Sequence, residues 1–330
     1  MSKLVNINPS KQDSSTSPSP GPAPFEDMVW IPGGAFMMGS NEHYREEAPA
    51  HQVTVDGFWM DKYAVTNAEF ARFVEATGYV TFCEKLPNPD DYPGAKPEMI
   101  VAASMLFRKP RQRVDLRNHY NWWTWVPGAN WRHPDGPGSS IKGRDRYPVV
   151  HVAFEDVEAY AKWAGKELPT EAEWEFAARG GLEGAAYAWG NEFSPGGKLL
   201  ANTWQGEFPI ENLKLDGFEG IAPVGSFPPN GYGLYEMTGN VWEWTTDWYE
   251  DHHQVEHSCC ANLNPRGGDR EKSYDPCSPE IKIPRKVMKG GSYLCAPNYC
   301  RRYRPAARMA QPIDTSTGHL GFRCVVRVPR

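Results

Sequence analysis

Residues 170–181 read TEAEWEFAARGG, and they contain the last convincing helix of this 330-residue chain. Thr170 and Glu173 have the spacing of a capping box, in which each side chain bonds to the other residue's backbone amide, and the glycines at 180–181 stop the helix. Beyond Gly181 no stretch of normal helical length combines periodicity with caps, so short strands and long ordered loops are expected. Long loops of this kind usually serve a function or hold a bound ion.

The remaining predicted elements lie on the N-terminal side of this helix. We expect helices at 66–78 and 155–165, and strands at 28–31 and 51–60. The first helix begins with another capping box and ends at a glycine, and the second begins with acidic residues that favour a helix N-terminus. Residues 51–60 alternate between apolar and polar, which indicates a half-buried strand.

The composition indicates an irregular α+β domain with little regular secondary structure. The chain contains 31 glycines and 30 prolines, which break it into short elements, and 13 tryptophans, which supply buried area. Residues 1–24 are too rich in Ser and Pro to pack, so they are expected to be a disordered tail. No internal repeat or linker divides the rest, and residues 25–330 are predicted to form one domain.

Charge and hydropathy exclude several classes of partner. The net charge of -6 argues against a nucleic-acid-binding protein, and the clearest local basic cluster runs from Arg301 to Arg308. No apolar run reaches the ~20 residues needed to cross a bilayer, and the N-terminus lacks the apolar core of a secretory signal. Seven cysteines are an odd number for a disulfide-stapled secreted domain. We therefore expect a monomeric, cytoplasmic protein of bacterial type without nucleic-acid or membrane partners.

The strongest chemical signal is the pair Cys295 and Cys300, in a segment that is otherwise aromatic, polar and basic. Arginines at 301, 302 and 304 should favour the thiolate form, and Pro297 should force a turn that brings the sulfurs together. One interpretation is a dithiol that binds a soft metal or cycles through a disulfide, with Cu(I) the better metal because zinc would need two further ligands. The other interpretation, two buried strand cysteines, is equally compatible with these residues.

Other possible metal ligands carry weaker signals. Cys259 and Cys260 are adjacent, with histidines at 252, 253 and 257 and a cysteine at 277, but the spacing of structural zinc sites is absent and an incidental loop cluster is favoured. Residues 201–204, 216–218 and 239–244 mix carboxylates, amides and loop carbonyls, which suits calcium but also ordinary turns. Structural roles are expected for the scattered histidines His51, His119, His133, His151 and His319.

The motifs together resemble the formylglycine-generating enzymes of the sulfatase-modifying factor family, from about Met28 to Arg327. The resemblance is carried by residues 31–40, 148–152, 163–175, 228–235, 239–244, 290–304 and 318–324. Most of these motifs specify only architecture, whereas SYxCxxxYC at 292–300 followed by RYRxAAR is specific to the catalytic branch.

This resemblance implies a single compact domain related to C-type lectins. It implies a copper-dependent oxidase that uses O2 and a thiol reductant to convert the cysteine of a CxPxR motif, in an unfolded sulfatase polypeptide, to Cα-formylglycine. The implied catalytic residues are Cys295, Cys300, Ser292, Tyr299 and Trp242, with the two cysteines as the Cu(I) ligands.

The resemblance also implies two structural calcium sites. The residues that match the first site are Asn202, Thr203, Asp216 and Phe218, and those that match the second are Glu236, Gly239, Val241 and Glu243. Glu236 replaces the asparagine that the family has at the second site, although a carboxylate is also a calcium ligand.

Two departures from the family pattern stand out. Secreted members carry two disulfides, and three of those four cysteine positions are Ala161, Ala178 and Pro305 here, so that Cys324 has no partner. Residues 257–287 form a longer insert than usual, and this insert contains three of the seven cysteines.

Two alternative functions use the same scaffold. A non-catalytic lectin-like binding module would have no need of the two cysteines, Ser292 or Tyr299, and their presence favours the oxidase. The sulfoxide synthases that share this domain carry an additional helical domain with a histidine-rich metal motif, for which this chain has no room.

Overall fold

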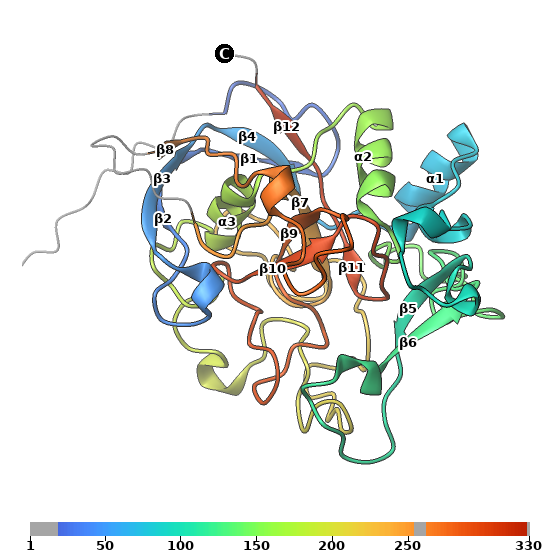
Figure 1. Ribbon diagram of the computed structural model, residues 1–330. Helices are drawn as coiled ribbons and strands as arrows, with labels where there is room; N and C mark the ends of the chain where they lie inside the picture. Colours follow the sequence, from blue (N-terminus) through green and yellow to red (C-terminus); the bar gives the residue numbers. More distant parts are fainter. Residues whose placement is uncertain (1–18, 254–261, 329–330) are drawn as a thin grey trace, which may run out of the picture.

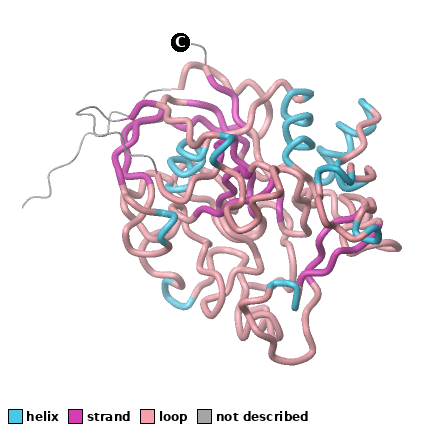
Figure 2. Tube along the Cα trace, viewed as in Figure 1, coloured by secondary structure: helices cyan, strands magenta, loops and turns pink. Residues whose placement is uncertain are grey.

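The computed structural model describes residues 19–253 and 262–328. Loops dominate these residues, as Figure 2 shows. The α-helices are α1 (Asn67–Thr77), α2 (Phe154–Trp163) and α3 (Glu171–Arg179). The strands are β1 (Met28–Ile31), β2 (Gly34–Met38), β3 (His51–Val55), β4 (Phe58–Asp61), β5 (Ala103–Phe107), β6 (Trp123–Pro127), β7 (Trp242–Trp248), β8 (Asn262–Leu263), β9 (Arg285–Lys289), β10 (Arg308–Pro312), β11 (Leu320–Gly321) and β12 (Val325–Arg327).

The helix predictions are confirmed, including their capping. Thr66 and Thr170 each form a complete capping box, and both helices end at a glycine in the left-handed conformation. The helix α2 begins one residue before the predicted acidic pair, and the Asp156 carboxylate accepts a hydrogen bond from the Ala153 amide. Beyond α3, the only helices among the described residues are short 3-10 turns.

The predicted strand at 51–60 is two strands, β3 and β4, separated by a two-residue break at Asp56 and Gly57. A side chain at Gly57 would clash with the ring of Trp30, since an added Cβ would lie 2.3 Å from it. The two strands belong to different sheets: β3 pairs with β2 and β8, and β4 pairs with β1 and β12. Sequence alternation alone could not reveal the break, because it depends on which strands from elsewhere in the chain pair with each half.

The sheet that positions the chemistry has the strand order β10-β9-β7-β11. Strands β9 and β10 run antiparallel, β7 and β9 also run antiparallel, and β11 pairs with β7 in parallel. Figure 1 shows this sheet in the middle of the molecule, with α3 to its left and the β5–β6 hairpin to its right. Strand β7 begins at Trp242, and β9 ends at Lys289, just before the segment with the two cysteines.

Tryptophans supply much of the buried core, as the composition predicts. Those with less than about 2% exposure are Trp122, Trp174, Trp204, Trp242 and Trp244. The largest buried cluster joins α1 and α2 to the central sheet and includes both Cys295 and Cys300. The cysteine pair therefore lies at the edge of the main core.

Buried ion pairs join the C-terminal part of the chain to α3, to β7 and to the 3-10 turn at Arg45–Glu47. They are Arg304–Glu47, Arg308–Glu171, Lys289–Glu175 and Arg323–Glu243. The predicted basic cluster from Arg301 to Arg308 is therefore wrong as a surface patch, since Arg304 and Arg308 are buried and neutralised. Charge counted along the sequence could not show that their partners come from distant elements.

Two further properties concern the described residues as a whole. Their helices are too short and too polar to cross a membrane. Their five cysteines, at 83, 277, 295, 300 and 324, are all free thiols. Cys324 therefore lacks a disulfide, as its partnerless position in the sequence predicts, whereas Cys259 and Cys260 lie outside the described residues.

Candidate active site

The segment after β9 folds back on itself and brings the two cysteines together. The chain leaves the strand through Gly290 and Gly291, both with positive φ, and an added Cβ on Gly291 would lie 2.8 Å from the backbone of Arg302. A turn around Pro297 then returns the chain, with the Cys300 amide donating to the Ala296 carbonyl at 2.8 Å. Figure 1 shows the C-terminal segments in red at the centre of the molecule.

The sulfur atoms of Cys295 and Cys300 are 3.1 Å apart. This separation is longer than the ~2.05 Å of a disulfide bond, and both residues are free thiols. Both side chains are buried, with exposures of 2% and 7%. The predicted turn therefore does bring the sulfurs together, although the segment is a loop rather than a strand.

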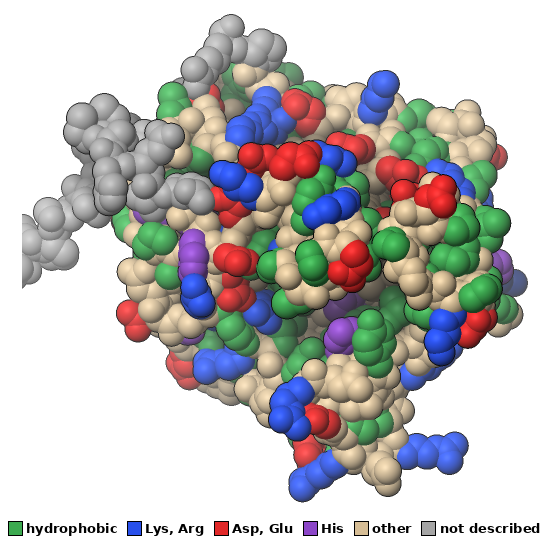
Figure 3. All heavy atoms as spheres, in the orientation of Figure 1, with side chains coloured by type: hydrophobic (Ala, Val, Ile, Leu, Met, Phe, Trp, Pro, Cys, Tyr) green, Lys and Arg blue, Asp and Glu red, His purple; other side chains and the backbone are tan. Residues whose placement is uncertain are grey.

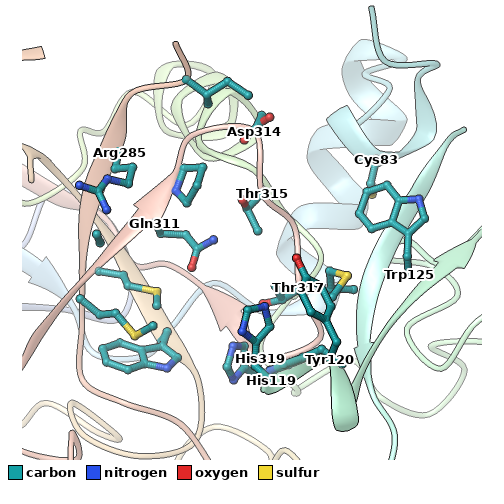
Figure 4. A pocket seen from close by; sticks show the side chains of 18 of the residues that line it. Cys83, His119, Tyr120, Trp125, Arg285, Gln311, Asp314, Thr315, Thr317 and His319 are labelled. Carbon is teal, nitrogen blue, oxygen red and sulfur yellow. The ribbon is translucent and has the colours of Figure 1, made fainter. Parts of the chain in front are cut away.

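The two sulfurs open into a pocket of about 840 Å³. All five residues that the resemblance implies for catalysis line it: Trp242, Ser292, Cys295, Tyr299 and Cys300. Figure 4 shows part of this pocket, with Arg285 and Trp125 on opposite sides, and Figure 3 shows a hollow edged by hydrophobic and histidine side chains. Trp242 and Cys300 thus share one cavity, although they lie more than 50 positions apart in the sequence.

The two thiols differ in their tendency to ionise. The hydrogen bond between the two thiols and the Arg302 guanidinium, which lies 4.0 Å from the Cys300 sulfur, lower the pKa of Cys300 to about 6. Burial raises the pKa of Cys295. Of the three arginines from which a positive field was predicted, Arg302 is the one that contacts the Cys300 sulfur, although it also pairs with Glu46. Arg304 is paired with Glu47, and Arg301 is exposed.

Aromatic rings form the wall next to the sulfurs. Tyr299 stacks on Phe208 with ring centroids 4.5 Å apart and meets the edge of Trp122 at 5.2 Å. Its side chain is 39% exposed, so one side of the ring faces the open pocket. Trp242 is buried at the start of β7 and also lines the cavity. These rigid rings suit an extended peptide, since aromatic side chains give contact area at low entropic cost.

Ser292 has a partner that the sequence did not reveal. Its hydroxyl lies 3.0 Å from Nδ1 of His319, which lines the same pocket and meets the edge of Trp123. Burial lowers the pKa of His319 to about 3, so the ring is neutral at pH 7. The hydrogen bond agrees with the structural role expected for His319, and the structure adds that this side chain lines the pocket. The only signal was its position in the motif at 318–324.

The residues of the first expected calcium site lie together in one loop cluster. The Asp216 carboxylate accepts hydrogen bonds from the amides of Thr203 and Phe218, at 3.1 and 3.0 Å. The side-chain amide of Asn202 donates to Asn240 and to the Gly220 carbonyl. Carboxylate and carbonyl oxygens are calcium ligands, so this donor set fits the ion.

The side-chain amide of Gln205 lies between two of these candidate ligands. It donates to the Thr203 carbonyl and, at 2.8 Å, to the Asp216 carboxylate. A cation bound by both oxygens would replace this amide. Gln205 is therefore the neighbouring side chain whose position calcium would change.

The carboxylates of the second expected calcium site have other partners. Both oxygens of Glu243 are bonded to Arg323, and one also accepts from the Trp174 indole at 2.7 Å. Glu236 accepts hydrogen bonds from the amides of Gly225 and Phe227. The acidic side chains of this set, with Gly239 and Val241 between them, do not fit a second ion, and we derive no role for one.

Comparison with known proteins identifies relatives along nearly the whole chain. The model of the sulfatase-modifying factor enzyme 1-like domain matches residues 14–328. A formylglycine-generating enzyme from Mycobacterium tuberculosis is 52% identical over 302 residues, which are 91% of this chain and 97% of that protein. The formylglycine-generating enzyme of Mus musculus is 48% identical over 308 residues, covering 92% and 76%.

Not every relative is named as an active enzyme. A protein from Mus musculus named an inactive C-alpha-formylglycine-generating enzyme 2 is 39% identical over 302 residues, covering 90% of this chain and 84% of that protein. Catalysis therefore has to be argued from the residues of the pocket as well as from family membership.

The fold is shared with solved structures. PvdO from Pseudomonas aeruginosa matches with a TM-score of 0.56 and 25% identity, covering 91% of this chain and 94% of that one. Treponema denticola variable protein 1 matches with a TM-score of 0.54 at 18% identity, covering 91% and 95%, and it shows the fold alone. The predicted architecture, a single C-type-lectin-like domain with little regular secondary structure, is confirmed.

Proposed function

Because this chain belongs to the sulfatase-modifying factor family, we propose that it oxidises the cysteine of a CxPxR motif in an unfolded sulfatase to Cα-formylglycine. Relatives named formylglycine-generating enzymes support the coarser statement that the protein matures sulfatases. We propose the finer features of the reaction: O2 as the oxidant, Cu(I) as the cofactor and CxPxR as the substrate motif.

One observation carries this proposal: two free, buried thiols lie 3.1 Å apart at the wall of an open pocket. A non-catalytic binding module would not need such a pair, since buried thiols side by side are open to oxidation and metal binding. Ser292, Tyr299 and Trp242 line the same pocket, which supports their assignment to the reaction.

The donor set fits Cu(I). Soft thiolates select this ion, and no described cluster of three or more His, Cys, Asp and Glu side chains offers a competing metal site. Cys295 and Cys300 would hold the ion, which supplies single electrons to O2, a chemistry that side chains alone lack. Ser292 and the aromatic wall would orient the substrate cysteine next to these sulfurs.

The overall reaction balances with a thiol reductant as co-substrate. The CH2–SH group of the substrate becomes CHO and its sulfur leaves as H2S. One oxygen atom of O2 is accounted for in the aldehyde and the other in water. Two electrons and two protons come from the reductant, which is oxidised to a disulfide. The free thiols of the described residues are compatible with such a reducing environment, and we place the protein in a bacterial cytoplasm as a monomer.

The substrate must enter as an extended chain. Proline in the motif lacks an amide donor and has a fixed φ, so the segment cannot form regular structure while it is read. Its arginine needs an acceptor, and the carboxylates that line the described pocket belong to Asp275 and Asp314. We therefore propose that the motif binds before the sulfatase folds.

We also propose calcium as a structural cofactor at the first site. Asn202, Thr203, Asp216 and Phe218 would hold it through side-chain and main-chain oxygens, after displacement of the Gln205 amide. Bound calcium would order loops that lack regular hydrogen bonding.

The proposal is tested with peptides. The full-length protein is incubated with a CxPxR peptide, Cu(I), O2 and a thiol, and the product is read by mass spectrometry and by aldehyde-specific labelling. We expect formylglycine from CxPxR and none from SxPxR. The CxPxA peptide should mainly raise KM, because the arginine contributes uniform binding. Absence of aldehyde from CxPxR under these conditions contradicts the proposal.

A further inference from the structure

A Cu(I) ion held by two thiolates forms a centre with a net negative charge. Two thiolates contribute -2 and Cu(I) contributes +1, so one negative charge remains at the pair Cys295 and Cys300. Both side chains are buried, and an unpaired buried charge is costly. The pocket therefore needs a cation beside the sulfurs, and this requirement rests on the function proposed above.

Only one cation that lines the described pocket contacts a sulfur. The cationic side chains in its wall are Lys85, Arg285 and Arg302. Lys85 pairs with Glu155, and Arg285 donates to the carbonyls of Ser273 and Tyr274. Arg302 places Nη1 4.0 Å from the Cys300 sulfur.

The guanidinium of Arg302 is held by residues from the other end of the sequence. Tyr44 lies beneath it, with the guanidinium carbon 4.0 Å from the ring centroid, and Glu46 accepts from Nη2 at 2.5 Å. The Tyr44 hydroxyl in turn accepts the Arg301 amide at 3.0 Å. Glu46 and its neighbour Glu47 lie in the 3-10 turn at Arg45–Glu47, and Glu47 forms the buried pair with Arg304.

This arrangement leaves part of the guanidinium available to the sulfurs. Glu46 takes Nη2 alone, whereas a carboxylate that saturated the group would take two nitrogens in a fork. Nη1 faces Cys300, and Nε is buried without a hydrogen-bond partner among the described residues. The cation is thus fixed in place by stacking and by one ionic contact, with donors left over.

We propose that Arg302 is the counter-ion of the Cys295–Cys300 centre when Cu(I) is bound, and that Tyr44 and Glu46 position it. The turn at 44–47 is then a part of the copper site, although it lies about 250 residues from the cysteines in the sequence. Arg302 is a positioning and charge-balancing residue and does not ligate the metal.

The test is the affinity for Cu(I), measured anaerobically on the full-length protein by competition with a chromophoric Cu(I) chelator. Arg302→Gln should weaken binding by about 10- to 100-fold, because it removes a charge about 4 Å from the centre. Arg302→Lys should weaken it less, since the charge is kept and the planar stack is lost. Arg301→Gln is the matched control: it removes the same charge next to Cys300, and we expect a change of less than about threefold because that side chain is exposed.

The positioning role needs a variant without a charge change. Tyr44→Leu removes the stack and should weaken Cu(I) binding. Tyr44→Phe keeps the aromatic ring and should retain most of the wild-type affinity for Cu(I). In the double variant Tyr44→Leu with Arg302→Gln, the loss should not exceed that of Arg302→Gln alone. Thermal melting of each variant without copper separates these effects from misfolding.

The outcomes separate this inference from the proposed function. If the wild type binds Cu(I) and Arg302→Gln, shown to be folded, binds equally well, the counter-ion role is wrong and the proposed oxidase stands. Equal losses in Arg301→Gln and Arg302→Gln would show a general charge effect and would also overturn it. A wild type without tight Cu(I) binding would overturn both the cofactor and the inference.

Discussion

Nδ1 of His319 lies 3.0 Å from the hydroxyl oxygen of Ser292, and both residues line the pocket that contains the sulfur pair. The same hydroxyl oxygen accepts the Leu294 amide at 3.3 Å, so its orientation is fixed from two sides. With a pKa lowered to about 3 by burial, His319 remains neutral and offers one donor and one acceptor nitrogen. Ser292 is thereby held in a defined rotamer next to the cysteines.

Replacing His319 should affect turnover more than substrate binding. His319→Phe removes the partner of Ser292 and should lower kcat by about 10-fold with a smaller change in KM, whereas His319→Asn keeps a short polar side chain and should retain more activity. Steady-state kinetics on a CxPxR peptide measures both constants. If the losses of His319→Phe and Ser292→Ala add fully in the double variant, the two side chains do not act as a unit.

The sequence predicted the elements whose signals are local. Capping boxes at Thr66 and Thr170, and the glycines after each helix, are short motifs with a direct physical meaning, and the structure confirms both helices. The turn that joins Cys295 to Cys300 could be predicted for the same reason, since Pro297 lies between them. The break between β3 and β4 at Gly57 was missed, because the two strands pair with different sheets built from other parts of the chain.

Long-range pairing could not be read from the chain. Arg304 and Arg308 look like a basic surface in the sequence, but Glu47 and Glu171 lie more than 130 residues away and neutralise them. The contact between His319 and Ser292 could not be predicted, because nothing near His319 in the sequence identifies Ser292 as its partner. Glu243 matches a calcium ligand by its position in the sequence, but in the structure its carboxylate accepts hydrogen bonds from Arg323.

Calcium removal should destabilise the protein if the first site is filled. We expect chelation of tightly bound calcium to lower Tm, because the loops at 202–218 lose the ion that orders them. Asp216→Asn should lower the Tm of the calcium-loaded protein and reduce its sensitivity to chelation. Differential scanning calorimetry measures Tm, and elemental analysis confirms the calcium content. An unchanged Tm after confirmed calcium loss would count against this site.

Breaking the pair Glu243–Arg323 should strongly destabilise the folded protein. Both side chains are at most 1% exposed and 2.8 Å apart, so Glu243→Gln leaves a buried charge without compensation and should cost about 3–5 kcal/mol. Arg144→Gln is the control, since it breaks an exposed pair with Asp135 that should be worth less than about 1 kcal/mol. Urea unfolding measures the loss of unfolding free energy in both variants. Similar small losses in the two variants would contradict the prediction that Glu243 compensates a buried charge.

His151 should make stability depend on pH in the acidic range. Burial lowers its pKa from 6.5 to about 4, so as the pH falls between these values the unfolded chain takes up a proton that the native protein does not. Its contribution is therefore complete above about pH 6.5 and is lost on acidification, with a slope of about 1.4 kcal/mol per pH unit.

The variant His151→Asn isolates this contribution. Asparagine tolerates the positive φ of 62° at this position and does not titrate. We expect the free energy of unfolding of the variant to fall less steeply than that of the wild type between pH 6.5 and 4. Curves that differ only by a constant offset would show that His151 is not the titrating group.

The central claim is that oxidation of a substrate cysteine by O2 depends on the paired sulfurs of Cys295 and Cys300, which would hold Cu(I). The most direct measurement is the yield of formylglycine from a CxPxR peptide with Cu(I), O2 and a thiol, read by mass spectrometry for wild type, Cys295→Ser, Cys300→Ser and Cys277→Ser. Cys277 is an exposed free thiol and serves as the matched control. The account predicts full yield from wild type and Cys277→Ser and no detectable product from the other two variants, all four being folded. Wild-type yield in Cys300→Ser would contradict it.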